Sequence, residues 1–265
     1  MLRIATWNIN SVRLRLPIVL RFLAEHGPDV LCLQETKCPN PLFPRDAFAE
    51  AGYPHIEVHG QKGYHGVATV ARVPLVDAWS RDYCAMGDTR HLTVTLERPG
   101  TSLRLHNFYV PAGGDEPDRD ANPKFDHKLR FVDEMRTLST GRDGSSDVLV
   151  GDLNIAPEEA DVWSSRQLRN VVSHTAVERE AMRGLIAHGN WHDLMRHHVG
   201  PDEPLYTWWS YRNRDWRASN RGRRLDHVWG SEDLPDRLRG MTVLVEARDW
   251  EKPSDHVPVI IDLDV

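Results

Sequence analysis

Two short oxygen-bearing side chains follow an apolar run near the middle of the chain. Residues 148–150 have the composition of a buried strand, and Asp152 and Asn154 come shortly after it, before Pro157 ends any strand pairing. Their i, i+2 spacing puts both side chains on one side of an extended backbone. Oxygens in that position suit a hard cation or the orientation of a water molecule. A lone Asp-x-Asn is also typical of an Asx turn that closes a strand.

The same arrangement, an apolar run followed by polar residues, recurs along the chain, and its members are Asn8, Glu35, Asp226, Asp255 and His256. Carboxylates gathered in one cleft repel one another unless a cation or protons neutralise them. Oxygen ligands favour Mg²⁺ or Mn²⁺, and such an ion neutralises charge on the leaving oxygen of a phosphate ester. A histidine beside an acid can be oriented or kept charged to stabilise a transition state. Taken singly, each residue is better explained as a strand end, a cap or a turn, whereas the whole set favours a catalytic site.

The order of expected elements would bring these residues to one edge of a sheet. A strand over residues 2–9, a helix from residue 12 that contains Pro17, and a strand over residues 29–33 form a β-α-β opening. Further expected elements are a loop over 39–44, a short helix over 46–51, strands over 66–71, 92–96 and 103–110, a helix capped by Asn122 and Pro123, a polar turn over 141–146, largely helical residues 158–200, an arginine-rich loop, and last strands over 225–229 and 257–265. The sequence predicts an α/β fold, one domain over residues 1–265 with two packed sheets and outer helices.

Composition and charge narrow the class of protein. No apolar run approaches the ~20 residues that span a bilayer, so we expect no membrane association. Three cysteines, an odd number without zinc spacing, suit a reducing cytoplasm. The net charge is −6, yet arginines crowd residues 212–224 against one acid, Asp215. An acidic chain with one basic stretch indicates a localised contact with a polyanion.

The motifs closely resemble those of the exonuclease III family of abasic-site (AP) endonucleases, within the endonuclease/exonuclease/phosphatase superfamily. They are residues 7–11 (WNINS), 33–37 (LQETK), 60–63 (GQKG), 107–111 (NFYVP), 151–157 (GDLNIAP), 207–212 (TWWSYR), 224–226 (RLD) and 254–256 (SDH). They follow one another in family order over nearly the whole chain. The resemblance implies a four-layered α/β sandwich of the DNase I-like type. It also implies a Mg²⁺-dependent DNA repair hydrolase that incises duplex DNA 5′ to abasic sites and processes 3′ ends. We expect Mn²⁺ to substitute for Mg²⁺, and we expect the protein to be cytoplasmic and monomeric.

The resemblance also assigns roles to individual residues. Glu35 corresponds to the principal metal ligand, assisted by Asn10, Asp255 and either Asp152 or Asn154. Asp152 corresponds to the residue that orients and deprotonates the attacking water, and His256, held by Asp226, to a contact of the scissile phosphate. The side chains implied to bind phosphate oxygens or the water are Asn8, Tyr109 and Asn154.

DNA contacts are expected from the arginine-rich stretch and its neighbours. Trp208 and Leu225 match positions that line the pocket for an extruded abasic sugar, which is cheap to flip because no base pair is lost. The expected backbone contacts are Arg212, Arg217, Arg221, Arg223, Arg224 and Trp216. Arg223 stands where some relatives carry Trp, which leaves open the balance between incision at abasic sites and 3′-exonuclease work. One tryptophan of the 208–209 pair is expected to pack in the core.

Two other functions stay open at this point. The first is a phosphoesterase of the same superfamily that acts on phosphoinositides, sphingomyelin or RNA, which the arginine-rich stretch and the Thr-Trp-Trp segment disfavour. The second is a nucleic-acid-binding protein without catalysis, which would require a missing active-site residue.

Overall fold

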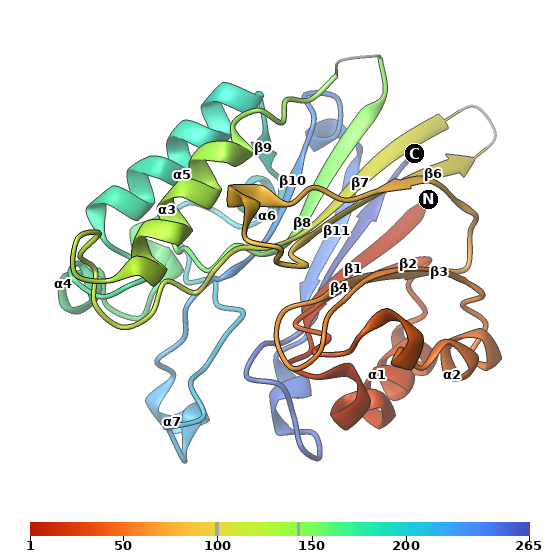
Figure 1. Cartoon of the computed structure of the whole chain (residues 1–265), viewed down its shortest axis with the longest axis horizontal. Helices are drawn as coiled ribbons and strands as arrows, with labels where there is room; N and C mark the ends of the chain where they lie inside the picture. The colour runs from red at the N-terminus through yellow and green to blue at the C-terminus, as the bar shows by residue number, and fades with distance from the viewer. Residues whose placement is uncertain (99–100, 142–143) are drawn as a thin grey trace.

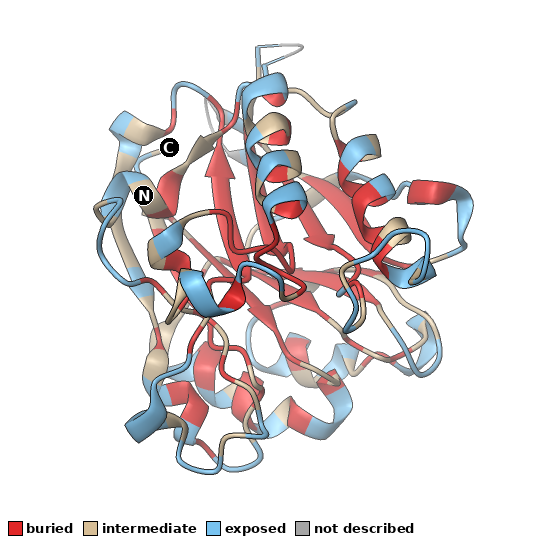
Figure 2. Ribbon diagram, turned by 90° about the vertical axis from the view of Figure 1, so that its left-hand side faces the viewer, coloured by how far each residue is buried: buried red, intermediate tan, exposed pale blue. Residues whose placement is uncertain are grey.

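Two β-sheets packed face to face, with helices on both outer sides, form the fold of the computed structural model (Figure 1). The structure describes residues 1–98, 101–141 and 144–265. Aliphatic side chains from both sheets, such as Ile4, Val94 and Val150, fill the space between the sheets. Figure 2 shows the strands as almost wholly buried and the helices as buried on their inner faces only. The expected four-layered sandwich is confirmed.

The first sheet has the strand order β11-β12-β1-β2-β4-β3. Its strands are β1 (Leu2–Asn8), β2 (Val30–Gln34), β3 (His55–His59), β4 (Val67–Ala71), β11 (Leu238–Val243) and β12 (Val259–Leu263). β1 pairs in parallel with β2 and antiparallel with β12. The carboxyl ends of β1 and β2 and the start of β12 therefore share one edge, which places the residues that follow β2 beside those that precede β12.

The second sheet has the strand order β5-β6-β7-β8-β10-β9. Its strands are β5 (Leu75–Trp79), β6 (His91–Arg98), β7 (Thr101–Tyr109), β8 (Ser146–Asp152), β9 (His192–Asp193) and β10 (Asp226–Gly230). β7 runs parallel to β8, and β10 runs antiparallel to β8 with Asp226 directly opposite Asp152. The polar ends of β7, β8 and β10 thus lie together.

Each outer layer of helices buries an apolar stripe against one sheet. Helices α1 (Val12–His26) and α2 (Arg45–Glu50) cover the first sheet. There Trp7 packs edge-on against Phe22, with their ring centroids 5.6 Å apart. Helices α3 (Pro123–Met135) and α5 (Ala176–Gly189) cover the second, where Phe131 and Met182 join Trp229. The shorter helices are α4 (Ser165–Leu168), α6 (Leu194–His198) and α7 (Trp216–Ser219), with 3₁₀ turns η1 (Asn40–Leu42), η2 (Tyr83–Ala85), η3 (Glu159–Asp161), η4 (Pro235–Arg237) and η5 (Val245–Asp249). Within the described ranges, no helix is long and apolar enough to cross a membrane.

Most expected elements are confirmed to within one or two residues, with several corrections. α1 does run through Pro17, and Asn122 caps α3 through its side chain, which accepts a hydrogen bond from the Lys124 backbone N–H. The expected elements omitted β3, β5, β9 and β11, and the arginine-rich loop contains the short helix α7. The loop expected over 39–44 contains η1. The expected turn over 141–146 includes residues 142–143, which lie outside the described residues. The cysteines Cys32, Cys38 and Cys84 are free and buried.

Candidate active site

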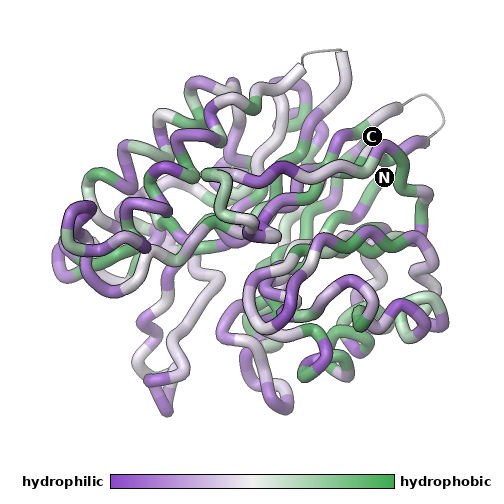
Figure 3. The backbone as a smooth tube through the Cα atoms, in the orientation of Figure 1, coloured by the Kyte–Doolittle hydropathy of each residue, from purple (hydrophilic) through white to green (hydrophobic). Residues whose placement is uncertain are grey.

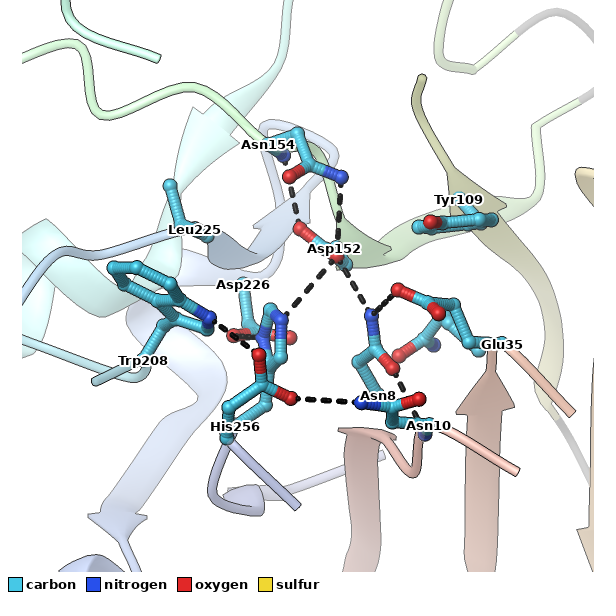
Figure 4. Close-up of polar contacts among 12 residues, drawn as sticks. Asn8, Asn10, Glu35, Tyr109, Asp152, Asn154, Trp208, Leu225, Asp226 and His256 are labelled. Atoms are coloured by element: carbon cyan, nitrogen blue, oxygen red, sulfur yellow. Dashed lines mark hydrogen bonds and ion pairs between the residues drawn. The ribbon is translucent and has the colours of Figure 1, made fainter. Parts of the chain in front are cut away.

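Side chains from three strand ends meet in one cleft between the edges of the two sheets (Figure 4). Asn8 ends β1, Glu35 follows β2, and Asp152 ends β8. The Asn8 Nδ2 donates to Glu35 Oε1 at 3.0 Å and to Asp152 Oδ2 at 2.8 Å. One amide therefore ties a carboxylate at the edge of the first sheet to a carboxylate of the second. The cleft, of about 580 Å³, is lined among others by Glu35, Asp152 and His256.

A chain of charged hydrogen-bonding groups runs through His256. Its Nδ1 lies 2.8 Å from Asp226 Oδ2, and its Nε2 lies 3.6 Å from Asp152 Oδ2. Burial lowers the pKa of His256, but the negative charges of Asp226 and Asp152 outweigh it and raise this pKa to about 10. Burial, together with repulsion from Asp226, raises the pKa of Asp152 to about 7 despite the attraction of His256. Asp152 is thus a carboxylate whose basicity suits proton abstraction near neutral pH, beside an imidazolium.

Asp152 forms the Asx turn that the motif allowed, and Asn154, the residue at the end of this turn, also lies at the site. The backbone N–H of Asn154 donates to Asp152 Oδ1 at 3.0 Å, with φ at 54°, a conformation that asparagine tolerates. Its Nδ2 donates to Asp152 Oδ2 at 3.1 Å and to Val110 O at 2.9 Å. Gly151 is required just before, because a Cβ there would meet Phe108 O at 1.9 Å. The local turn therefore aims Asp152 instead of merely ending the strand.

The oxygens expected to bind a metal lie on the first-sheet side of the cleft. Asn10 Nδ2 donates to Asp255 Oδ1 at 3.1 Å, and Lys37 Nζ lies 2.9 Å from Glu35 Oε2 and 2.6 Å from Asn10 Oδ1. The ammonium of Lys37 is thus held by two of the expected ligand oxygens, which places both within reach of a single cation. Burial opposes ionisation of the carboxyl groups of Glu35 and Asp255. The positive charge of Lys37 nevertheless lowers the pKa of Glu35, and the positive charge of His256 lowers the pKa of Asp255. This donor set fits a hard divalent cation.

A second group with metal-like spacing consists of Asp152, Asp226 and His256, whose ligand atoms lie within 4.8 Å of one another. The imidazole of His256 already contacts a carboxylate through each of its nitrogens. Its raised pKa keeps it protonated, and an imidazolium is not a metal ligand. We therefore interpret this group as a relay of one hydrogen bond, Asp226–His256, and one ion pair, His256–Asp152, which leaves Glu35, Asn10 and Asp255 as the expected ligands of a cation.

Tyr109 and Trp208 complete the walls of the cleft. Tyr109 is buried beside Glu35, and burial raises its pKa well above the ordinary value, so its phenol stays neutral. Trp208 Nε1 donates to Asp255 Oδ2 at 2.9 Å, and Leu225 lies near it in the same cleft. Trp209 instead packs in the core, so the two neighbouring tryptophans divide as expected between cleft and core.

The structure corrects the expected DNA contact of Arg224. This residue is fully buried, with Nη1 donating to Asp193 Oδ2 at 2.7 Å and Nη2 to Asp161 Oδ2 at 3.0 Å. Burial opposes its charge, but these two acids raise its pKa. A side chain that is enclosed by two carboxylates and has no exposed surface cannot reach a phosphate of bound DNA, so the expectation for Arg224 is wrong and its role is structural.

Replacing Arg224 with alanine should lower the free energy of unfolding by roughly 3–5 kcal/mol, because two carboxylates would lose their buried cation. Urea denaturation of the purified variant measures this change. The matched control is Arg221→Ala, an exposed residue three positions earlier, for which we expect a change within about 0.5 kcal/mol. Equal urea midpoints for the two variants would contradict the structural role.

The other expected contacts of the arginine-rich stretch divide into two sets. Arg212, Arg221 and Arg223 line the cleft. Arg217 forms an exposed ion pair with Asp249, and Trp216 donates its Nε1 to the same carboxylate at 3.0 Å. The segment around α7 projects from the sandwich, and its tip is strongly hydrophilic (Figures 1 and 3). A DNA contact of any of these residues stays a prediction.

Two lysines at the site were not among the residues expected from sequence. Lys37 holds the ligand oxygens described above. Lys128 is buried in α3, where its Nζ donates to Asn154 O at 2.7 Å and to Glu178 Oε1 at 2.5 Å. The available signal was the position of Lys128 on the apolar stripe of α3, next to Leu129, where a solvated lysine does not fit. This lysine fixes the backbone that presents Asn154.

Known proteins resemble this chain over nearly its whole length. The model of the Endonuclease/Exonuclease/phosphatase family matches residues 5–256. Exodeoxyribonuclease III of Haemophilus influenzae is 28% identical, over 97% of this chain and 98% of its own length. An AP endonuclease structure from Archaeoglobus fulgidus superimposes with a TM-score of 0.89 at 33% identity, covering 100% of both chains. The 3′–5′ exonuclease NExo from Neisseria meningitidis gives a TM-score of 0.87 at 33% identity, again over 100% of both chains.

Proposed function

We propose that this chain, which belongs to the endonuclease/exonuclease/phosphatase family, hydrolyses the phosphodiester 5′ to abasic sites in duplex DNA and removes nucleotides or blocking groups from 3′ ends, with Mg²⁺ as its cofactor. The relatives that match over their full length identify the class of enzyme: the chain is a hydrolytic DNA repair nuclease of the exodeoxyribonuclease III and AP endonuclease group. The observation that carries the proposal is the relay Asp226–His256–Asp152, joined through Asn8 to Glu35. The choice of abasic sites, the ion and the residue roles are our proposals.

Asp152 acts as the general base in this proposal. Its carboxylate, oriented by Asn8 and by the Asn154 backbone, takes a proton from the attacking water. The imidazolium of His256, held by Asp226, binds a non-bridging oxygen of the scissile phosphate and stabilises the negative charge of the transition state. Asn8, Asn154 and the neutral phenol of Tyr109 fix the positions of the water and the phosphate.

Glu35, Asn10 and Asp255 would hold the divalent ion, with Asp152 or Asn154 assisting. When bound, the ion would supply positive charge that offsets the negative charge developing on the departing 3′ oxygen. The shared contact of Lys37 with Glu35 and Asn10 supports this placement, because two oxygens that already surround one cation need little rearrangement to take another. Mg²⁺ is favoured because the donors are oxygens, and Mn²⁺ should replace it.

Duplex DNA is the proposed partner, with an extruded abasic sugar placed between Trp208 and Leu225. The structure of a 3′ phosphatase from Neisseria that is 33% identical to this chain holds a product DNA hairpin, which supports DNA as the substrate. We place the protein in the cytoplasm, where its three buried free cysteines would stay reduced, and we take it to act as a monomer.

The proposal is tested with three substrates and one preparation: a duplex with one tetrahydrofuran abasic analogue, an undamaged duplex, and an inositol polyphosphate. We expect incision immediately 5′ to the analogue in Mg²⁺ or Mn²⁺, slow shortening of 3′ ends, and neither with chelator. Hydrolysis of the inositol compound alone would contradict the proposal and favour another phosphoesterase of the family. Binding of the duplex without cleavage under every metal condition would favour the non-catalytic alternative.

Replacing Arg212 or Arg221 with alanine should weaken DNA binding and reduce its salt dependence. Both side chains lie at the cleft, and each lost phosphate contact lowers the slope of log Kd against log salt by roughly 1. Fluorescence anisotropy over a salt series measures the slope. The control is Arg239→Ala. Arg239 is an exposed residue of β11, away from the cleft, and forms an ion pair with Asp264. Slopes equal to that of the wild type would show that neither arginine contacts a DNA phosphate.

A further inference from the structure

Arg15, near the start of α1, has a buried guanidinium that is bonded to three separate loops. Its Nη1 donates to the carbonyl oxygen of Asn10, in the loop that follows β1. Its Nε donates to Lys252 O at 3.2 Å and to Pro253 O at 3.0 Å, in the loop before β12. Its Nη2 donates to Tyr211 Oη at 2.9 Å, in the loop before α7. One side chain therefore joins loops that are distant in sequence.

Each of these loops carries a residue of the candidate active site. Asn10 is itself an expected metal ligand, and Pro253 lies two residues before Asp255, another expected ligand. Tyr211 Oη donates to Pro253 O at 2.8 Å, and the same segment holds Trp208, whose Nε1 donates to Asp255 Oδ2 at 2.9 Å. The guanidinium thus links the backbones of two expected ligands through bonds that involve neither ligand side chain.

The acceptors of the Arg15 guanidinium are main-chain carbonyls and one phenol, none of them charged. A buried cation with uncharged acceptors is costly, so charge pairing does not explain why an arginine stands here. A guanidinium holds five N–H donors in fixed directions in one plane, whereas a lysine ammonium carries three donors on one atom. An arginine can therefore hold several loop carbonyls at fixed distances where a lysine cannot.

The backbone next to Arg15 needs such support. Asn10 and Ser11 are consecutive residues with positive φ, 48° and 89°, a conformation that residues other than glycine rarely adopt. Backbone of this kind persists only where its surroundings hold it in place. On the side of β2 the Ser11 N–H donates to Glu35 O at 2.7 Å, and on the side of β12 the Arg15 guanidinium bonds the Asn10 carbonyl.

The side-chain contacts of the expected ligands cannot give this support when an ion is bound. Asn10 Oδ1 accepts from Lys37 Nζ at 2.6 Å, and Asn10 Nδ2 donates to Asp255 Oδ1 at 3.1 Å. An ion held by these oxygens would compete with both contacts. The bonds of Arg15 to main-chain oxygens would remain.

We propose that Arg15 is a positioning residue that fixes the distance between the Asn10 and Asp255 backbones and thereby raises the affinity of the cleft for a divalent ion. The inference rests on the proposed function, because it takes Asn10 and Asp255 as ligands of that ion. Arg15 acts through the loops that carry these ligands and supplies no ligand atom. Loss of a supporting contact around a metal site lowers metal affinity roughly 10- to 100-fold.

The experiment measures Mn²⁺ binding to the DNA-free protein by electron paramagnetic resonance, and incision of an abasic duplex over a Mg²⁺ series. In Arg15→Lys, which keeps the charge but loses the planar fork, we expect the Kd for Mn²⁺ to rise roughly 10- to 100-fold. The Mg²⁺ concentration that gives half-maximal incision should rise by a similar factor. The rate at saturating Mg²⁺ should stay near that of the wild type, because full occupancy restores the ion.

Arg21→Lys is the matched control, because Arg21 lies on the same helix but is exposed and pairs with Glu25. It should keep the wild-type Kd for Mn²⁺. Tyr211→Phe removes one acceptor of Arg15 without a change of charge, and it should raise this Kd by a smaller factor. This second variant decides the test if urea denaturation shows that Arg15→Lys does not fold.

An unchanged Kd for Mn²⁺ in a folded Arg15→Lys, even with a lower urea midpoint, would show that Arg15 only stabilises the fold and would overturn the inference. The same holds for Tyr211→Phe where Arg15→Lys does not fold. In either case, incision by the wild type would leave the proposed function standing. Failure of the wild type to bind Mn²⁺ or to incise the abasic duplex would overturn the proposed function itself.

Discussion

Replacing Asp152 with asparagine should reduce incision at an abasic site by at least about 10³-fold. The amide keeps the size of the side chain and one acceptor oxygen but cannot take a proton from water, so the general-base contribution is lost. Asp152 is nearly fully buried and accepts bonds from Asn8 and Asn154, which hold it in one orientation. Single-turnover incision of a duplex with one tetrahydrofuran site measures the loss.

The control for Asp152→Asn is DNA binding, measured by anisotropy in the presence of chelator. Binding should survive, because Asp152 is buried and its side chain adds almost nothing to the protein surface that would contact DNA. Equal incision by variant and wild type would show that Asp152 is misassigned. Loss of binding and incision together would indicate that the substitution disturbs the cleft as a whole.

Replacing Asp226 with asparagine should reduce incision by roughly 10²- to 10⁴-fold, in the range found when the acid that orients a catalytic histidine is neutralised. The pKa of His256 stands at about 10 despite burial because of Asp226 and Asp152. The imidazolium is therefore retained as pH rises until about 10. Without the charge of Asp226 the pKa falls, so the proton is lost at lower pH, and the deficit of the variant should grow from pH 6 to pH 9.

Two measurements check the Asp226 prediction. The first is the pH profile of incision for variant and wild type at saturating metal. The second is NMR titration of the His256 ring in metal-free protein, which should find the wild-type ring protonated at pH 8 and the variant ring titrating at lower pH. Parallel pH profiles and an unchanged ring titration would mean that Asp226 does not control the charge of His256.

The strand-end acids were predictable because their signal is local. An apolar run and a polar side chain lie close together in sequence, with a glycine between them before Asp152, and parallel pairing of β1 with β2 and of β7 with β8 brings such ends to one edge. The missed strands lack this signal: β5 is exposed over its last residues, and β11 has little buried surface. β3 does carry a local signal, because Ile56 and Val58 alternate with polar residues.

The neighbouring arginines 223 and 224 mark the limit of sequence reasoning. Successive side chains on an extended backbone point to opposite faces, so one arginine must turn inward and the other toward the cleft. Which one turns inward is decided by Asp161 and Asp193, residues distant in sequence that meet Arg224 only in the folded chain. The contact of Lys37 with Asn10 depends on tertiary structure in the same way.

The central claim is that a single phosphate is shared by the acids and amides of one cleft, with a divalent ion on its first-sheet side. A crystal structure of the Asp152→Asn variant with an abasic duplex and Mg²⁺ tests it most directly. We predict a scissile phosphate in hydrogen-bond contact with His256 and Asn154, and the ion bound to Glu35. A phosphate bound elsewhere, or an ion held between Asp226 and His256 instead, would contradict the account.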